Sequence, residues 1–347
     1  MQGMIIEAPS RTYELHIGAG AVEMLGETLF RLGASGVALV TDANIAAIHG
    51  ERVREIIEAA GFSPLCVTIE AGETHKTLAT IETLYAQFAS AGLNRRSVVV
   101  ALGGGIVGDV AGFAAATFMR GMPIVQVPTT LVAQVDSSVG GKTGVNVRAV
   151  KNLVGAFWQP SEVIADTDML ATLPPRELRA GMGEVAKYFA LGATELLPLL
   201  SPHPTATELE EIVALCCASK ATFVACDELD TGARAALNFG HTFAHAIEAI
   251  FDYGRYNHGE AVAIGMRFAL EVGATLKITP QSAVDMVADA MARAGIDTAL
   301  PIAARELVPL MTGDKKNTSG DITLVLLEEI GKPILYKISP EKLESLL

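Results

Sequence analysis

The stretch that decides the fold is SVVVALGGGIVGDVAGFAAATF, residues 97–118. It begins with an uncharged β-branched run, turns on three consecutive glycines, and continues with small apolar residues at helical spacing. A buried strand that turns on glycine into a helix is typical of open α/β sheets. Gly103, Gly105 and Gly108 also match GxGxxG, in which backbone amides at a helix N-terminus receive a pyrophosphate. The match is weak on its own, because strand–helix turns without a ligand share it.

Segments on either side extend this pattern. Buried strands are expected at 37–42, 64–70 and 123–128, and helical patterns lie between them. Strands that are apolar on both faces and alternate with helices predict a parallel sheet covered by helices. We therefore expect an α/β protein that begins with a Rossmann-like domain.

The character of the chain changes after about residue 173, where helical patterns dominate. One β-hairpin is expected over 322–338. The expected domains are a Rossmann-like NAD-binding α/β domain over 1–175 and an α-helical metal- and substrate-binding domain over 176–347.

The net charge argues against several partner classes. The 347 residues include 39 Asp+Glu and 26 Lys+Arg, a formal charge of −13. Nucleic acids and anionic membranes bind proteins through a basic surface, so neither is expected as a partner. The first ten residues lack a signal-peptide pattern and no long apolar run occurs, which predicts a cytoplasmic protein.

Four lysines stand apart from the charged surface pattern. They are the only lysines between residues 77 and 276, and all lie in glycine-rich or apolar segments: Lys142, Lys151, Lys187 and Lys220. This placement favours a cation-lined pocket for phosphate or carboxylate groups. The alternative is four separate lysines whose stems cover apolar surface.

The helical half carries a candidate metal site. His241 and His245 are four residues apart on one helix face, His258 follows, and Glu184 precedes them. Two imidazoles and one carboxylate suit a divalent metal with an open position for a substrate hydroxyl. Spacing leaves open whether His245 is a ligand or a hydrogen-bonding neighbour, and buried structural histidines are the alternative.

Other polar residues lie where a nucleotide would bind an open α/β sheet. Asp42 ends a strand and is the expected ribose partner, and Glu73 and Lys76 lie on a loop after another strand. Asp109 either bonds a hydroxyl or caps the helix that follows the glycines.

Several long motifs in register carry a family resemblance. They include GGGIVGDVAGFAAATFMRG, VPTTLVAQVDSSVGGKTGVN, LATLPPRELRAGMGEVAKY, LNFGHTFAHAIE and HGEAVAIGM. Together they resemble the 3-dehydroquinate synthases, which belong to the sugar phosphate cyclases. The resemblance implies NAD as cofactor, zinc as the metal with cobalt as the alternative, and a homodimer.

The resemblance also implies roles for individual residues. Its NAD contacts fall on Asp42, Glu73, Lys76, Gly104, Gly105, Asp109, Thr129, Thr130, Lys142, Lys151 and Thr172. Its metal ligands fall on Glu184, His241 and His258. Its catalytic residues fall on Asp136, Lys142, Lys187, Arg234, Asn238 and His245, the last as a proton-transfer group. Its substrate contacts fall on Arg120, Asn152, Lys220 and Lys316, with Lys315 as the alternative to Lys316. Arg120 is expected to reach the phosphate in the neighbouring subunit.

The activity implied is that of a lyase of the shikimate pathway, in aromatic amino acid biosynthesis. The substrate would be 3-deoxy-D-arabino-heptulosonate 7-phosphate and the products 3-dehydroquinate and phosphate. The steps would be transient oxidation by NAD, β-elimination of phosphate, reduction, ring opening and intramolecular aldol closure. Alternatives are another sugar phosphate cyclase, a metal-dependent polyol dehydrogenase and a non-catalytic NAD sensor.

Overall fold

The computed structural model describes residues 1–148, 150–251, 254–311 and 320–347. The chain forms two compact units. Unit 1 comprises Met1–Leu173 and Leu209–Glu228, and unit 2 comprises Pro174–Glu208 and Leu229–Leu347. Among the described residues, no helix combines the length and apolar character that crossing a membrane requires.

Unit 1 is built on a seven-stranded sheet in the order β1-β2-β9-β6-β5-β3-β4. Only β1 is antiparallel to its neighbour. The strands are β1 (Gln2–Ala8), β2 (Arg11–Gly18), β3 (Val37–Asp42), β4 (Leu65–Ile69), β5 (Val98–Gly103), β6 (Ile124–Pro128) and β9 (Glu162–Asp166). The predicted fold class, a Rossmann-like parallel sheet followed by helices, is confirmed.

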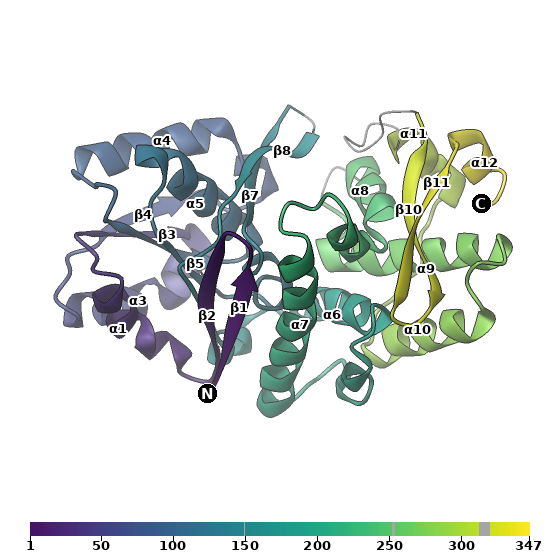
Figure 1. The fold of residues 1–347 in the computed structure, drawn as a ribbon, viewed down its shortest axis with the longest axis horizontal. Helices are drawn as coiled ribbons and strands as arrows, with labels where there is room; N and C mark the ends of the chain where they lie inside the picture. The colour runs from purple at the N-terminus through teal and green to yellow at the C-terminus, as the bar shows by residue number, and fades with distance from the viewer. Residues whose placement is uncertain (149, 252–253, 312–319) are drawn as a thin grey trace. The chain divides into compact units, whose positions relative to one another are not determined.

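Helices cover both faces of this sheet (Figure 1). On one face α4 (Leu78–Ser90) and α5 (Gly105–Thr117) bury Ala38 and Val40 of β3. On the other face α1 (Leu25–Arg31) and α3 (Glu51–Ala59), which follows the short α2 (Ala43–Ile45), bury Val37 and Leu39. Successive strand residues point to opposite faces, so the apolar run of β3 fills two cores.

Two strands of unit 1 form a separate hairpin that no pattern predicted. β7 (Lys142–Val147) and β8 (Val150–Phe157) pair antiparallel outside the main sheet. Their sequence mixes Gly, Lys and Asn with Val, so neither the strict alternation nor the apolar run of a strand is present. The hairpin matters for function because it carries three of the expected site residues: Lys142, Lys151 and Asn152.

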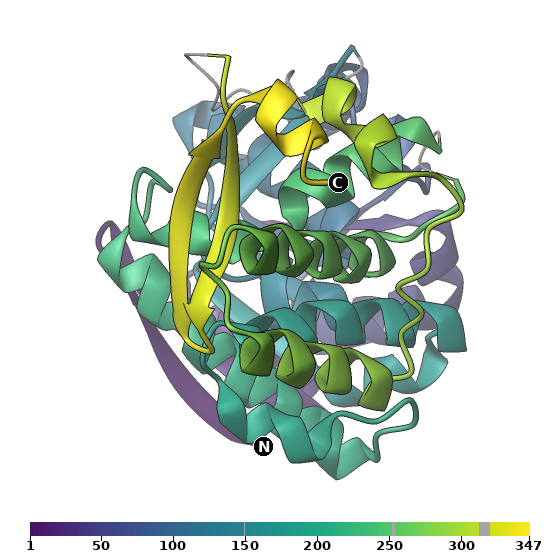
Figure 2. The ribbon, with the colours of Figure 1, turned by 90° about the vertical axis from the view of Figure 1, so that its right-hand side faces the viewer.

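Unit 2 is mainly helical, as expected. Its helices are α6 (Pro175–Ala190), α8 (His241–Ile250), α9 (His258–Thr275), α10 (Gln281–Arg293), α11 (Val308–Met311) and α12 (Pro340–Glu344). The predicted late hairpin is present as β10 (Ile322–Glu329) and β11 (Lys332–Ile338). It lies beside α9 (Figure 2), and the Thr242 hydroxyl of α8 donates to the Thr323 carbonyl of β10 at 3.0 Å.

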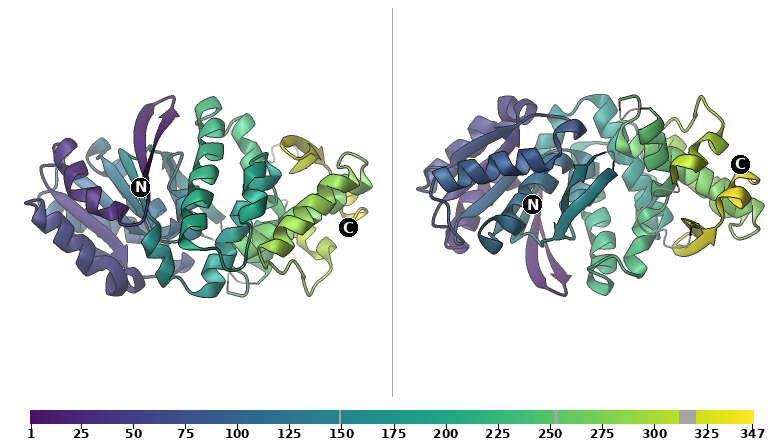
Figure 3. Two further views of the ribbon diagram at one scale, coloured as in Figure 1. Left: turned by 90° about the horizontal axis from the view of Figure 1, so that it is seen from below. Right: turned by 90° about the horizontal axis from the view of Figure 1, so that it is seen from above.

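One helix groups differently from the expected uninterrupted domain over 176–347. α7 (Ala206–Cys226) belongs mostly to unit 1, where it lies beside the β1–β2 hairpin in both views of Figure 3. Lys220 donates to Asp136 at 2.7 Å, and Glu228, just after α7, accepts from Ser10 at 2.9 Å. These polar contacts join segments that are far apart in sequence. A single domain boundary near residue 175 therefore does not separate the two units.

Close backbone contact holds the helices of unit 2 together. A Cβ on Gly259 of α9 would lie 1.6 Å from the Ala180 carbonyl oxygen of α6. A Cβ on Gly265, also in α9, would lie 2.1 Å from the carbonyl oxygen of Gly240, just before α8. Only glycine permits such an approach, so α9 touches the backbones of both neighbours at these points.

This contact gives a stability prediction. Gly259→Ala should lower the free energy of unfolding by about 3 kcal/mol or more, because backbone on both sides prevents relaxation. Urea unfolding followed by circular dichroism measures the loss. Gly3→Ala is the matched control, since a Cβ there meets nothing within 4 Å. Equal stability of the two variants would contradict the packing argument.

Candidate functional site

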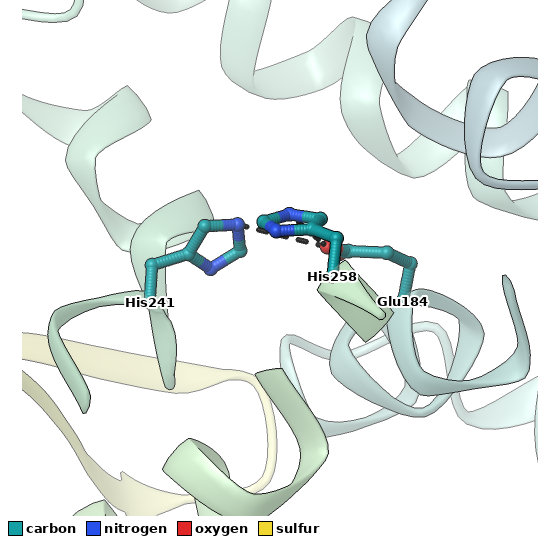
Figure 4. Close-up of side chains that lie close together, drawn as sticks. All are labelled: Glu184, His241 and His258. Atoms are coloured by element: carbon teal, nitrogen blue, oxygen red, sulfur yellow. Dashed lines mark ion pairs between the residues drawn. The ribbon is translucent and has the colours of Figure 1, made fainter. Parts of the chain in front are cut away.

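Three side chains of unit 2 converge as a candidate metal centre (Figure 4). They are Glu184 of α6, His241 of α8 and His258 of α9, and their ligand atoms all lie within 4.8 Å of one another. The Nε2 atoms of His241 and His258 lie 3.6 and 3.3 Å from Glu184 Oε1. The Glu184 side chain is fully buried. Two imidazoles therefore face one carboxylate oxygen.

Glycines place all three side chains. Glu184 follows Gly183, His241 follows Gly240, and His258 precedes Gly259. Each histidine is the first residue of its helix, and Asn257 forms a capping box with Glu260 at the start of α9. The backbone contacts that bring α6, α8 and α9 together thus also bring the three ligands together.

Each histidine is oriented through its other ring nitrogen. His258 Nδ1 lies 3.1 Å from Glu248 Oε1, and His241 Nδ1 lies 3.3 Å from the Phe239 carbonyl oxygen. Both acceptors require a proton on Nδ1, which leaves the Nε2 lone pair for a metal. Carboxylate and carbonyl partners of this kind are typical of zinc-binding histidines. The donor set and its orientation fit a divalent metal.

The pKa values of the two histidines are shifted in opposite directions. Burial, aided by Lys187, lowers the pKa of His241 to about 3. Burial also opposes protonation of His258, but the hydrogen bonds to Glu184 and Glu248 outweigh it and raise its pKa to about 10. His258 therefore carries the proton of the cluster at neutral pH.

The other residues expected in unit 2 lie near the ligands in sequence. The His245 ring centroid is 5.9 Å from that of His241, and the group of three ligands does not include it. Lys187 Nζ lies 2.7 Å from Glu184 Oε2, and its side chain is 1% exposed. Arg234 and Asn238 lie on a 3-10 turn before α8, and Arg234 is buried. Lys315 and Lys316 lie outside the described residues.

In unit 1 the candidate nucleotide site lies where the strand order reverses. The chain passes from β3 to β4 on one side and from β5 to β6 on the other, so β3 and β5 flank a switch point. Ligands of open α/β sheets bind outside the carboxyl ends of such strands. Asp42 ends β3, and Gly104 leads from β5 into α5.

Neighbouring side chains pack closely on the glycine turn at the N-terminus of α5. A Cβ on Gly104 would lie 3.1 Å from Thr130 Cγ2, and one on Gly105 would lie 3.0 Å from Ser137 Oγ. The buried Thr129 hydroxyl beside this turn has no hydrogen-bond partner among the described residues. A helix N-terminus and an unsatisfied hydroxyl fit the pyrophosphate of a dinucleotide.

Two carboxylates proposed for the nucleotide have other contacts. Asp42 Oδ1 caps α2 by accepting from the Asn44 and Ile45 amides at 2.9 and 3.1 Å. Asp109 does not cap α5, whose N-cap is Gly104, so the helix-cap alternative for Asp109 is wrong. Burial raises the Asp109 pKa, and Lys76 opposes that shift.

A polar network joins residues from the expected cofactor and substrate groups. Lys76 Nζ donates to both Asp109 and the side-chain oxygen of Asn152. Lys76 and Asp109 were expected to bind NAD, and Asn152 was expected to bind substrate. Asn146 connects the loop that carries Glu73 to Asn152 through further hydrogen bonds.

The four unusual lysines differ in exposure. Lys187 and Lys220 are buried, but Lys151 is half-buried and Lys142 is exposed. The cation-lined pocket that the sequence predicts stays a prediction, and Lys142 would line it from an exposed position.

The remaining expected residues lie at turns. The Thr172 hydroxyl donates to the Met169 carbonyl at 2.8 Å and lies 2.9 Å from His49 Nε2. Thr130 Oγ1 accepts from the Ala133 amide at 3.2 Å. Arg120 is exposed and has a left-handed φ of 63°.

Sequence reasoning missed three polar partners: Glu248, Asn146 and His49. Glu248 was detectable as a lone carboxylate in the apolar run FAHAIEAIF, because a buried carboxylate requires a partner. Asn146 lies among glycine and valine residues, and its residue type alone does not indicate which partners it has. His49 had no signal, since its contact with Thr172 joins segments 123 residues apart.

The second contact of His258 yields a metal-affinity prediction. Glu248→Gln should weaken Zn²⁺ binding about 10- to 100-fold, because the oriented imidazole loses its carboxylate partner. Competition with a chromogenic chelator measures the affinity. Glu271→Gln, at an exposed position of α9, is the control and should bind Zn²⁺ like the parent protein. Unchanged affinity in Glu248→Gln would show that this hydrogen bond does not orient a ligand.

The raised pKa of His258 yields a pH prediction. A metal must displace the proton that His258 holds below pH 10, so Zn²⁺ affinity should rise with pH, by about tenfold per unit between pH 6.5 and 8. Calorimetry at pH 7 in two buffers of different ionisation enthalpy should show about one proton released per ion. A proton count near zero would contradict this assignment.

Comparison with known proteins identifies the family. Residues 66–180 match the 3-dehydroquinate synthase N-terminal family model, and residues 181–317 match the C-terminal one. The 3-dehydroquinate synthase of Acidithiobacillus ferrooxidans is 41% identical, with 96% of this chain and 94% of the relative covered. That of Pelobacter propionicus is 42% identical, with 100% and 99% covered. The solved structure of 2-deoxy-scyllo-inosose synthase with carbaglucose-6-phosphate, NAD⁺ and Co²⁺ aligns at a TM-score of 0.92 and 26% identity over 99% of both chains. This chain belongs to the 3-dehydroquinate synthase family.

Proposed function

We propose that this protein converts 3-deoxy-D-arabino-heptulosonate 7-phosphate to 3-dehydroquinate and phosphate. The observation that carries the proposal is the convergence of Glu184, His241 and His258 in a chain whose 41% identical relative bears that enzyme's name. A centre of this composition binds and polarises a substrate hydroxyl. We therefore class the protein as a phosphate-eliminating lyase.

The proposed cofactors are NAD and a divalent metal, Zn²⁺ or Co²⁺. Unit 1 would hold NAD at the turn of Gly104 and Gly105, and unit 2 would hold the metal. Support comes from the fit of both sites and from the NAD⁺ and Co²⁺ in the structure of 2-deoxy-scyllo-inosose synthase. When bound, NAD⁺ accepts a hydride and later returns it, and the metal polarises the hydroxyl that is oxidised.

The chain's own charges suit a substrate with two anionic groups. Lys187 and Arg234 are buried cations of unit 2, and Lys220 is a buried cation of unit 1. Lys187 and Lys220 each lie 2.7 Å from a carboxylate oxygen, which offsets the cost of burying their charge. Fixed cations of this kind bind phosphate and carboxylate without reorganising during reaction.

His245 is the proposed proton-transfer residue. It lies one helical turn after His241, and the two rings are 5.9 Å apart at their centroids. It would accept a proton from the substrate hydroxyl that is oxidised and return it when that carbon is reduced, while Lys187 and Arg234 hold the substrate in place. Asp136 and Asn238 would fix its hydroxyl groups.

A second copy of the chain is proposed to complete the enzyme. Arg120 would extend to the phosphate held by the partner, as the family resemblance implies. Consecutive left-handed residues, Met119 with φ 54° and Arg120 with φ 63°, direct this exposed turn. Such strain is retained where a side chain must be aimed.

Two other reactions remain as alternatives. The structural match to 2-deoxy-scyllo-inosose synthase favours another sugar phosphate cyclase. Its sequence identity to this chain is 26%, however, whereas that of the 3-dehydroquinate synthases is 41–43%. A polyol dehydrogenase would use the same metal but would not require several buried cations. Substrate and redox balance separate all three.

The proposal predicts phosphate release without net reduction of NAD⁺. Purified protein supplied with catalytic NAD⁺ and Zn²⁺ should release one phosphate per heptulosonate phosphate consumed, while absorbance at the NADH wavelength stays flat. The hydride returns to the same substrate molecule, which is the physical reason. A phosphate assay, NADH absorbance and mass spectrometry of the product measure these quantities.

Two outcomes would overturn the proposal. Stoichiometric NADH would indicate a dehydrogenase, and turnover of a hexose 6-phosphate in preference to the heptulosonate would indicate a different cyclase. His241→Ala serves as the inactive control, because it removes a metal ligand.

A further inference from the structure

Asn146 occupies an irregular point of the β7–β8 hairpin. The strands pair regularly up to Val145, and the register shifts before Val147 pairs with Val150, so the strand register gives Asn146 no paired residue on β8. Instead it forms a parallel bridge with Thr77, and its amide donates to the Lys76 carbonyl at 2.8 Å. At this irregularity one residue of β7 stands opposite three residues of β8, 151–153, and Asn146 pairs its backbone with the loop at 76–77.

The Asn146 side chain continues this contact in two directions. Its Nδ2 donates to Glu73 Oε1 at 2.8 Å and to the Glu73 carbonyl at 3.3 Å. Its Oδ1 accepts from the Asn152 amide at 2.9 Å. A carboxylate only accepts and a backbone amide only donates, so these partners fix the orientation of the Asn146 side chain.

The Asn152 amide that donates to Asn146 belongs to a residue with an uncommon backbone conformation. Asn152 has φ 48°, a left-handed conformation that few residues other than glycine adopt. In this conformation the Asn152 side-chain oxygen accepts from Lys76 Nζ, which also donates to Asp109. One asparagine therefore connects Glu73 to Asn152. Lys76 contacts both asparagines, because its carbonyl accepts from the Asn146 amide and its Nζ donates to the Asn152 side chain.

We propose that Asn146 is a positioning residue that holds the NAD-side carboxylate of Glu73 and the substrate-side amide of Asn152 in register. This inference rests on the proposed function for the roles of Glu73 and Asn152. It goes beyond that function because it gives Asn146, to which the proposed function assigns no role, an effect on both ligands through Glu73 and Asn152.

The two halves of the contact can be removed separately. Asn146→Asp keeps an oxygen that accepts from the Asn152 amide but places a second carboxylate against Glu73. Asn146→Ala removes both halves. We expect Asn146→Asp to weaken NAD⁺ binding roughly tenfold or more, while KM for the heptulosonate phosphate at saturating NAD⁺ changes less than about threefold. Asn146→Ala should weaken both.

Double variants separate positioning from general loss of structure. If Asn146 acts on substrate through Asn152, Asn146→Ala should raise KM little further when Asn152→Ala is already present. Likewise, Asn146→Asp should cost little NAD⁺ affinity on a Glu73→Gln background, because an amide there donates to the new carboxylate. Additive effects in both cycles would overturn the proposal.

Controls exclude misfolding and keep the test independent of turnover. Asn94→Ala is the matched control, since the side chain of this exposed asparagine of unit 1 also joins two other residues, by accepting hydrogen bonds from Ser35 and Arg96. Every variant is checked for its unfolding temperature and Zn²⁺ content, which a positioning role leaves unchanged. NAD⁺ affinity is measured by calorimetry without substrate.

If the parent protein does not turn over the heptulosonate phosphate, the proposed function fails, and the measurement of NAD⁺ affinity alone then tests the role of Asn146. NAD⁺ affinity within twofold of the parent in both variants would overturn the inference.

Discussion

The approach of α9 to the backbones of α6 and of the turn before α8 is the constraint on which unit 2 depends. A Cβ on Gly259 would lie 1.6 Å from a carbonyl oxygen, so this contact exists only with glycine. The residues next to the contacting glycines are Glu184, His241 and His258. The same packing that closes the helical core therefore sets the spacing of the metal ligands, and stability and chemistry share one determinant.

Burial of charge next to opposite charge is the second principle of the structure. Lys76, Lys187 and Lys220 are each at most 5% exposed, and each contacts a carboxylate: Asp109, Glu184 and Asp136. Such pairs contribute little net stability, because desolvation offsets their attraction. In the proposed function, these pairs supply a rigid, polar environment for an anionic ligand. The net charge of −13 describes the exterior and says little about these few cations.

Sequence patterns predicted the strands that are buried on both faces. They did not predict the elements whose position depends on polar contacts between distant segments. β3 and β5 are apolar on both faces, and their strands matched prediction within a residue. The β7–β8 hairpin mixes glycine, lysine and asparagine, and was missed. The sequence of α7 has the pattern of any buried helix and does not indicate which unit the helix joins. The contacts of Lys220 and Glu228 with unit 1 involve partners that are 84 and 218 residues away in sequence.

The sequence by itself determined the fold class, the family and the types of residue available for catalysis, because periodicity and motif spacing are local properties of the chain. Only the tertiary structure decided which of these residues meet. It brought together three ligands from three helices, assigned Glu248 to His258, and showed that Lys142 is exposed whereas Lys187 is buried. Hydrogen bonds between distant segments and close glycine contacts depend on packing in three dimensions, and no local pattern records them.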